Sequence, residues 1–311
     1  MTRIQNFDDV NDNDLKDTMI TFGNFDGVHL GHRALIDKLI SNSLKNNCKS
    51  VLITFNPHTR NITTDNKQDL ILDYSDKIEI LKKTSLDYVL IVSFTSAFSN
   101  ISAEDFISLL IKKIKPKGFL LGFDSRFGCN GLGDSKFLNN YIKKNKLDIS
   151  NEIFPEFKFH DKIIKSSYIK DLITNGHVEK ANIFLDRKYF IKGNVIKGRN
   201  LGSKIGFPTA NLKLSQKKQI LPMHGVYCVT LEVGNKSYLG LCNVGLRPTF
   251  EGDSSSLSIE THLINCSIDL YGENVKIIFL NFLRKEIKFN SATELAEQIN
   301  SDIKKIEHME Y

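Results

Sequence analysis

The sequence predicts an α/β domain built on a parallel sheet, followed by a β domain, an antiparallel barrel or sandwich that ends in a helix. Three observations support this fold class. Between residue 19 and about residue 155, runs that are apolar throughout alternate with helical patterns, as in a parallel sheet covered on both faces. After residue 189, short β-rich segments are separated by Gly and Asn. The chain then closes with an apolar stripe at helical spacing.

In the first part, the expected strands and helices alternate along the chain. The strands are predicted at residues 19–22, 51–55, 88–94 and 119–122, and the helices at residues 76–83, 103–113 and 135–144. Ligands of parallel sheets bind beyond the carboxyl ends of the strands. Because the loops after residues 22, 55 and 121 follow strands directly, we expect these loops to converge on one crevice.

The second part begins with short helices predicted near residues 169–174 and 179–185. Strands are then predicted at residues 189–196, 226–233, 237–244, 257–264 and 275–283. Ser291 and Glu294 have the spacing of a capping box, and the helix that they open carries the stripe Leu295, Ile299, Ile303 and Ile306. We expect a domain boundary between residues 187 and 188, which gives domains of 1–187 and 188–311.

The composition is that of a water-soluble chain. Of its 311 residues, 41% are hydrophobic and 25% charged, and no stretch approaches the roughly 20 apolar residues that span a bilayer. The N-terminus is polar and acidic where a signal peptide would be basic and then apolar. We therefore expect a cytoplasmic protein with no membrane partner, and a monomer by default.

Cysteine spacing and charge narrow the chemistry further. The five cysteines are scattered without a CxxC pair, which argues against a disulfide framework and a zinc site. The net charge of +6 comes from lysines spread along the chain, so attraction of small anions explains it as well as nucleic acid would. We expect no nucleic-acid partner.

Residues 21–32, TFGNFDGVHLGH, form the central motif, and they are predicted to run from a strand through a tight turn into a helix. Unpaired N–H groups at a helix start suit a phosphate, and glycines let the backbone approach it. His29 and His32 are three residues apart, so they share one helix face and both can donate to phosphate oxygens. The alternative is a chance pair of surface histidines.

The string GNFDGVHLGH resembles the nucleotide-binding signature of adenylyltransferases related to class I aminoacyl-tRNA synthetases. The particular residues of this string are similar to those of the bacterial bifunctional riboflavin kinase/FAD synthetase family. That resemblance implies a Rossmann-like nucleotidyltransferase domain followed by a riboflavin kinase barrel. TFNPHTRN at 54–61, GFDSRFG at 122–128 and SSYIK at 166–170 resemble the family's TFxPHPR, GxDFRFG and SSTxIR.

The resemblance implies roles for particular residues of the first domain. His29 and His32 are the expected catalytic residues, and Asp124 and Phe127 are expected to meet the flavin. The expected ATP-binding residues are Gly23, Asn24, Phe25, Asp26, Gly27, Ser166, Ser167 and Lys170. For residues 166–170 the alternative is a polar loop that enters a helix.

Several residues depart from the family pattern. Lys170 stands in place of an arginine, Lys165 precedes the two serines, and Ser125 stands where a phenylalanine is usual. A lysine supplies charge but cannot hold a phosphate in bidentate fashion. The loss of a ring at Ser125 is expected to slow FAD synthesis relative to the family.

In the second part, GSKIGFPTANL at 202–212 resembles the GRxLGFPTANL string of riboflavin kinases. The resemblance implies that Thr209 and Asn211 reach Mg²⁺ and phosphates, and that ATP lies against Gly198, Gly206 and Pro208. Hydroxyl and amide oxygens suit a hard cation. The alternative is a Pro-initiated turn. Ser203 replaces the family's arginine, so one positive charge is either absent or supplied by Arg199 or Lys204.

The kinase resemblance continues through GVYCV, NVGLRPTF, IETHL, DLYG and LRKEIKF. Glu260 matches the catalytic glutamate, which takes the proton from the ribityl hydroxyl, and Arg284 and Glu286 match a region that closes the flavin site. His262 falls on the same strand face as Glu260 and is placed to tune it. Without the resemblance, Glu260 would be interpreted as a solvated side chain on an alternating strand.

The resemblance implies two reactions, both with Mg²⁺. ATP and riboflavin give FMN and ADP in the barrel, and ATP and FMN give FAD and pyrophosphate in the first domain. One alternative is a riboflavin kinase whose first domain is weak or inactive. Another is a flavin-responsive binding protein that lost the chemistry, but the presence of Glu260, Thr209 and Asn211 argues against it, since a binder has no use for a base.

Overall fold

The computed structural model describes residues 2–11, 15–63, 69–198, 201–215, 218–248 and 255–309. The chain divides into two compact units, Met1–Ser166 and Ser167–Tyr311. Helices α7 (Ser166–Thr174) and α8 (Val178–Leu185) therefore group mainly with the second unit. The boundary between the two expected activities, after residue 187, stays a prediction.

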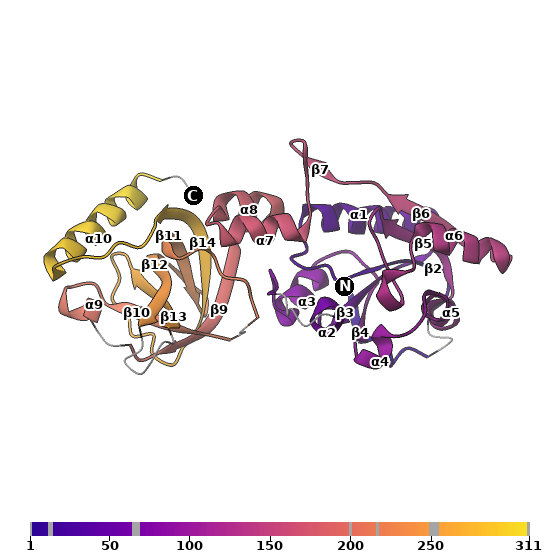
Figure 1. Ribbon diagram of the computed structural model, residues 1–311, viewed down its shortest axis with the longest axis horizontal. Helices are drawn as coiled ribbons and strands as arrows, with labels where there is room; N and C mark the ends of the chain where they lie inside the picture. Colours follow the sequence, from indigo (N-terminus) through magenta and orange to yellow (C-terminus); the bar gives the residue numbers. More distant parts are fainter. Residues whose placement is uncertain are drawn as a thin grey trace. The chain divides into compact units, whose positions relative to one another are not determined.

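The first unit is built on a six-stranded sheet in which every neighbouring pair is parallel (Figure 1). The strand order is β1-β4-β3-β2-β5-β6. The strands are β1 (Arg3–Asn6), β2 (Thr18–Gly23), β3 (Lys49–Asn56), β4 (Tyr88–Ser93), β5 (Pro116–Gly122) and β6 (Ser150–Phe154). The predicted parallel sheet is thus confirmed. The edge strands β1 and β6 were missed because they lack the continuous apolar runs of the central strands.

Helices connect these strands, and they begin at side chains that satisfy their first N–H groups. Ser102 caps α5 by accepting from the Asp105 N–H, and Asp134 caps α6 by accepting from the Phe137 N–H. The helices are α1 (Leu30–Lys45), α3 (Tyr74–Lys82), α5 (Ala103–Ile114) and α6 (Ser135–Lys144), with the short turns α2 (Arg60–Thr63), α4 (Ser96–Ser99) and η1 (Cys129–Gly131) and the hairpin β7 (Lys158–Phe159) and β8 (Lys162–Ile163).

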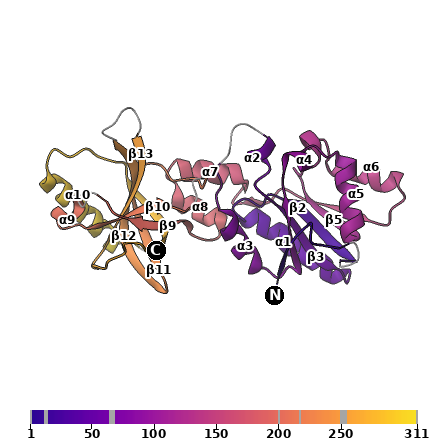
Figure 2. The same ribbon diagram turned by 90° about the horizontal axis from the view of Figure 1, so that it is seen from below.

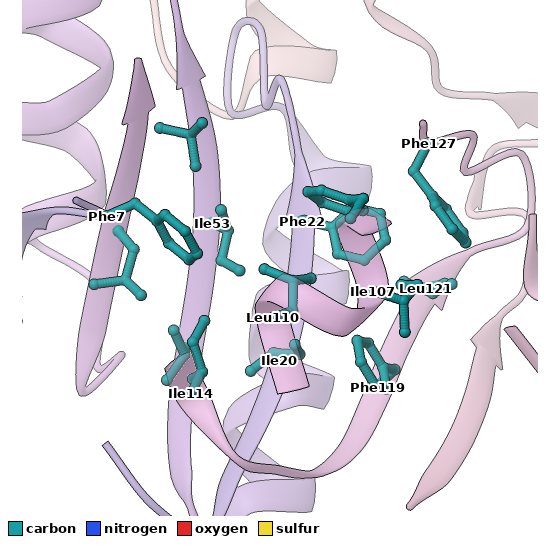
Figure 3. Close-up of a cluster of buried hydrophobic side chains, with 14 of the residues drawn as sticks. Phe7, Ile20, Phe22, Ile53, Ile107, Leu110, Ile114, Phe119, Leu121 and Phe127 are labelled. Atoms are coloured by element: carbon teal, nitrogen blue, oxygen red, sulfur yellow. The ribbon is translucent and has the colours of Figure 1, made fainter. Parts of the chain in front are cut away.

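A buried cluster of apolar side chains joins α5 to one face of the sheet (Figure 3). Phe22, next to the last residue of β2, packs edge-on against Phe106 of α5 at 5.2 Å and against Phe127, beyond β5, at 5.4 Å between ring centroids. Such edge-to-face pairs add to the free energy of area burial. The cluster therefore holds the segments after β2 and β5 next to each other.

The strand order also locates a binding crevice. From β2 the chain moves through β3 to β4 on one side, and it returns with β5 on the other side of β2. In open parallel sheets, ligands bind outside the carboxyl ends of the strands at such a reversal. The loop after Gly23 and the loop after Gly122 both lie there.

The second unit is a closed antiparallel barrel with the order β10-β13-β12-β11-β14-β9. Of the two predicted alternatives, a barrel and a sandwich, the barrel is therefore confirmed. The strands are β9 (Tyr189–Ile196), β10 (Thr209–Leu214), β11 (Gly225–Val233), β12 (Lys236–Pro248), β13 (Ser255–Leu263) and β14 (Asn274–Arg284). The segment after Pro208 is strand β10, so the alternative of a Pro-initiated turn is wrong, although the sequence did not predict a strand there. It pairs with both β9 and β13, which supply the partners that its own sequence does not reveal.

Helix α10 (Ala292–Glu307) lies against this barrel (Figure 2). Ser291 accepts from the Glu294 N–H, as the capping box predicts. Ile306 is fully buried among Val226, Leu241 and Leu280, and Ile299 and Ile303 pack at the edge of the same cluster. The short helix α9 (Leu201–Lys204) precedes β10. Across the described ranges, no helix combines the length and hydrophobicity needed to cross a membrane.

Candidate active sites

The first candidate site is the loop between β2 and α1. His29 is the N-cap of α1, and its Nδ1 accepts from the backbone N–H of His32 at 3.3 Å. The two imidazoles are stacked, with centroids 3.6 Å apart and an interplanar angle of 16°. Since Nδ1 accepts, the neutral His29 ring carries its proton on Nε2 and can donate from that atom. The two histidines are thus adjacent, as their spacing predicts.

The backbone of this loop takes unusual conformations. Phe25 and Val28 have φ values of 49° and 39°, a left-handed region that is rare for side chains with a branched Cβ such as Val28. Such conformations persist where the surrounding structure enforces them, often at binding sites. Gly27 has a φ of 80°, and a Cβ there would lie 2.9 Å from Cδ1 of Ile71. Gly27 is therefore required both by conformation and by packing.

Side chains of the loop hold it in place. Asn24 donates from Nδ2 to Oγ1 of Thr59 at 2.8 Å and accepts from the Thr59 N–H at 3.1 Å. The buried Asp26 accepts from the Ile71 N–H at 3.0 Å. Ser166 donates from Oγ to the carbonyl oxygen of Asp26 at 3.0 Å. The side chains of Asn24 and Asp26 are thus engaged within the protein, and Ser166 lies next to the loop.

A cavity of about 630 Å³ opens beside this loop, and it is here called the aromatic cavity. Gly23 and Asn24 line it together with rings from several elements: Phe22, Phe55, Phe94, Phe98, Phe106 and Phe127. Phe127 is thus placed in the cavity wall, whereas Asp124 is exposed in the turn that follows β5. Because the chain has no tryptophan, the composition leaves Phe or Tyr as the stacking residue, and the fold shows that six phenylalanines gather here.

The second candidate site lies on the paired strands β10 and β13. Thr209 is opposite His262 and Asn211 is opposite Glu260, and directly opposed residues of an antiparallel pair point to the same face. Glu260 accepts from Oγ1 of Thr209 at 3.3 Å through Oε2, and from Oγ of Ser258 at 2.9 Å through Oε1. The structure therefore gathers the expected base and the expected metal-binding residues on one face.

Two cavities adjoin this face. The smaller, of about 380 Å³, is lined by Gly198, Pro208 and Thr209 with residues 266–271, and it is here called the small barrel cavity. The large barrel cavity, of about 700 Å³, is lined by Thr209, Glu260, Arg284 and Glu286, and by α10. Thr209 lines both cavities, so the two cavities meet at this residue.

The residues around the large cavity are linked to one another. Arg284 donates from Nε to Oδ2 of Asp302 at 2.7 Å, which ties β14 to α10. Glu286 accepts from Nδ2 of Asn243 at 3.1 Å. His262 contacts the Pro208 carbonyl oxygen through Nδ1 at 2.9 Å, so it holds the entry to β10.

Glycine is required at positions 198 and 206, on either side of α9, for two different structural reasons. A Cβ on Gly198 would lie 2.2 Å from Nδ2 of Asn211, so the amide packs directly on the Gly198 backbone. Gly206 has a φ of 88° in the turn between α9 and β10. Gly198 therefore limits the space around the Asn211 amide, whereas Gly206 is required by the backbone of the turn that leads into β10.

The donors at the β10–β13 face fit a magnesium ion. Within the described ranges there is no group of three or more His, Cys, Asp or Glu that would form a metal cage of protein ligands. Thr209, Asn211 and Glu260 instead offer hydroxyl, amide and carboxylate oxygens. Mg²⁺ takes few protein oxygens of this kind and keeps water and phosphate oxygens as its other ligands.

In a comparison with known protein families, the two candidate sites fall in segments that match two different families. Residues 11–168 match the FAD synthetase family profile, and residues 185–310 match the riboflavin kinase profile. The bifunctional riboflavin kinase/FMN adenylyltransferase of Bacillus subtilis (strain 168) is 36% identical over 288 residues, which cover 92% of this chain and 90% of the relative. The chain belongs to this bifunctional family. The resemblance seen in the sequence is thus confirmed.

Two further comparisons cover most of the chain, one with a curated sequence and one with a solved structure. The bifunctional riboflavin kinase/FMN adenylyltransferase of Escherichia coli (strain K12) is 35% identical over 288 residues, covering 91% of this chain and 90% of the relative. The crystal structure of a protein described as a macrolide-efflux protein from Streptococcus pneumoniae has a TM-score of 0.86 and 28% identity, with 99% of each chain covered. The fold of this chain is therefore shared with that solved structure over nearly its whole length.

The departures from the family pattern lie in different places. Ser125 closes the turn after β5 by donating its N–H to the Gly122 carbonyl. Lys165 Nζ lies 5.0 Å from the centroid of the Phe123 ring. Ser167 and Lys170 belong to the second unit, and their role at the ATP site of the first unit stays a prediction.

In the kinase part, Ser203 is exposed on α9. Arg199 lies outside the described residues, as does the side chain of Lys204, so neither candidate for the missing charge is placed.

Sequence reasoning missed Lys77, a buried cation next to the first site. Its amine donates to the carbonyl oxygen of Asn24, in the motif loop, at 3.2 Å. The signal was present, because Lys77 shares the apolar face of α3 with Ile78 and Leu81.

Proposed function

We propose that the protein converts riboflavin to FAD in two steps at two sites. In the barrel, ATP and riboflavin give FMN and ADP, and in the first unit, ATP and FMN give FAD and pyrophosphate. One observation carries the first step: Thr209, hydrogen-bonded to Glu260, lines both barrel cavities. A nucleotide in one cavity and a flavin in the other would meet at this pair.

In the kinase step, Glu260 accepts the proton of the ribityl hydroxyl as that oxygen forms a bond to the γ-phosphorus of ATP. The bond from the γ-phosphorus to the bridging oxygen breaks, and ADP leaves. Thr209 and Ser258 orient the carboxylate by donating to one oxygen each. Thr209 and Asn211 would hold Mg²⁺, which supplies neutralisation of phosphate charge when bound. Arg284 and Glu286 would border the flavin.

In the adenylyl transfer, a phosphate oxygen of FMN attacks the α-phosphorus of ATP and pyrophosphate leaves. The reaction needs no nucleophile from the enzyme, only alignment and stabilisation of charge. His29 and His32, together with the start of α1, would donate to the phosphates. The aromatic cavity, with Phe127 in its wall, has rings on which a flavin can stack.

Incubation of the purified protein with riboflavin, ATP and Mg²⁺, followed by chromatography of the flavins, tests the proposal. FAD is the expected product. FMN alone would favour the second candidate, a riboflavin kinase with a weak or inactive adenylyltransferase domain, for which Lys170 and Ser125 are the reasons. Unchanged riboflavin would contradict both candidates and favour a flavin-binding protein.

The proposal includes a setting for the enzyme. We propose the cytoplasm, where ATP is available, and a monomer as the default state. The partners are the small molecules riboflavin, FMN and ATP. Nucleic acid and membranes have no part in either reaction.

A further inference from the structure

Lys77 of α3 is a buried lysine, with only 8% of its surface exposed. Lysine is almost never buried to this extent unless its charge has partners. Its ammonium donates to Oγ1 of Thr54 at 3.0 Å, to the carbonyl oxygen of Asn24 at 3.2 Å and to the carbonyl oxygen of Phe55 at 3.3 Å. An ammonium has three N–H groups, so each has an acceptor.

These acceptors belong to the end of β3 and to the loop between β2 and α1. Thr54 Oγ1 also donates to the Asn24 carbonyl oxygen at 3.2 Å, so that oxygen accepts from two side chains. The Asn24 side chain is in turn bonded to Thr59, in the loop that follows β3. Asn24 is therefore fixed through both its main chain and its side chain.

We propose that Lys77 is a positioning residue for adenylyl transfer, which fixes the Asn24–Phe25 peptide and thereby the loop that receives the ATP phosphates. In a trans peptide the N–H points away from the carbonyl oxygen. With the Asn24 oxygen directed at Lys77, the Phe25 N–H is directed to the opposite side. Lys77 itself touches neither nucleotide nor flavin. This inference rests on the proposed function of the loop.

A purely structural role would not require a charge at this position. A methionine fills a similar volume, and it avoids the free-energy cost of burying an ammonium. The three hydrogen bonds instead use the ammonium to hold a loop in which Phe25 and Val28 have left-handed φ values. Holding such a conformation requires strong surrounding contacts.

The test compares Lys77→Met with Lys82→Met in the full-length protein. Lys82 lies on the same helix but is exposed and paired with Glu79, so it is a matched control. For Lys77→Met we expect the KM for ATP in FMN adenylylation to rise at least about tenfold, since small misplacements cost up to about 10²-fold. The riboflavin kinase activity, which belongs to the other unit, should stay unchanged. Lys82→Met should match the wild type in all of these.

Calorimetric titration with α,β-methylene-ATP gives a readout that does not depend on turnover. Two sites are expected in the wild type, and in Lys77→Met the affinity of one should fall at least about tenfold. If the wild type forms no FAD but this loss of affinity is seen, the adenylylation proposal fails and the inference on the loop stands. Unchanged ATP affinity and KM in a folded Lys77→Met protein would overturn the inference.

Thr54→Val provides a second test if Lys77→Met does not fold. It removes one donor to the Asn24 oxygen while the ammonium remains. The KM for ATP should rise in the same direction by a smaller factor. An unchanged KM in Thr54→Val, together with unfolding of Lys77→Met, would mean that the lysine serves only stability, and the inference would be rejected.

Discussion

Oγ1 of Thr209 lies 3.3 Å from Oε2 of Glu260, on strands β10 and β13, although the two residues are 51 positions apart in the chain. The hydroxyl proposed as a metal ligand is thus bonded to the carboxylate proposed as the base. Orientation of the base and orientation of the metal site are therefore coupled. Variants at either residue should be analysed for both functions.

Glu260→Ala should stop FMN formation while FAD is still made from supplied FMN. General-base catalysis contributes about 10²–10⁴-fold, so riboflavin phosphorylation should fall by that factor. Glu260→Gln is the matched control for packing, since its amide oxygen can still accept from Thr209 but cannot take a proton. Chromatographic assay of each half-reaction measures the effect. Wild-type FMN formation by Glu260→Gln would exclude Glu260 as the base.

His29→Ala should abolish FAD synthesis while FMN formation continues. This change removes both the imidazole donor and the cap of α1, and the loss of a cap costs about 1 kcal/mol. His29→Asn separates these effects, because asparagine can cap the helix but has no imidazole. FAD synthesis restored by His29→Asn would mean that His29 acts as a cap only. If His29→Ala also stopped FMN formation in a folded protein, the division into two sites would be wrong.

Gly198→Ala should impair the kinase and leave the adenylyltransferase intact. The new Cβ would lie 2.2 Å from Nδ2 of Asn211, so the amide must move away from its place opposite Glu260. We expect FMN formation to fall at least about tenfold and the Mg²⁺ concentration needed for half-maximal rate to rise. Titration of Mg²⁺ in the kinase assay measures this. An unchanged Mg²⁺ dependence would contradict the role of Asn211.

Asp302→Ala should destabilise the barrel unit. The Asp302 carboxylate is fully buried and accepts from Arg284 and from Gln298 of its own helix. Removal of one partner of a buried ion pair costs about 3–5 kcal/mol, because the other charge is left buried. The double variant Arg284→Met, Asp302→Leu should recover most of the stability, as judged by calorimetry. A raised KM for riboflavin in that recovered protein would support the flavin role of Arg284.

Stability should depend on pH through Lys77. Burial lowers the pKa of Lys77 from 10.5 to about 8, against the opposing effect of the Asp26 carboxylate. Tyr74, whose ring centroid lies 5.9 Å from Nζ, has its own pKa raised by burial. Between pH 8 and 10.5 the unfolded chain keeps a proton that the folded chain has lost. The free energy of unfolding therefore rises with pH in that window, by at most about 3 kcal/mol.

Calorimetry of the wild type and Lys77→Met at about pH 7.5 and pH 9.5 measures this linkage. The wild type should gain stability relative to the variant as the pH rises, and the difference between the two proteins removes the contributions of tyrosines and cysteines. The rate of FAD synthesis by the wild type should instead fall as the pH rises, because the neutral amine of Lys77 has one N–H fewer to hold the loop. A stability difference that is the same at both pH values would show that Lys77 does not titrate in this range.

The sequence by itself determined the elements whose signals are local. The apolar runs of β3 and β5 predicted a parallel sheet, the capping box of Ser291 and Glu294 predicted the start of α10, and the motif strings at 21–32 and 202–212 indicated the family. Each of these signals depends on residues only a few positions apart, so it can be recognised from the periodicity of the sequence or from a short motif.

Only the tertiary structure decided which distant residues meet. It made residues 209–214 a strand, placed Asn211 opposite Glu260, gathered six phenylalanines around one cavity and directed Lys77 at Asn24. The physical reason is that strand order and register are set by burial of the whole core, because a shift of one residue would turn every side chain of a strand to the other face. No local pattern contains that information.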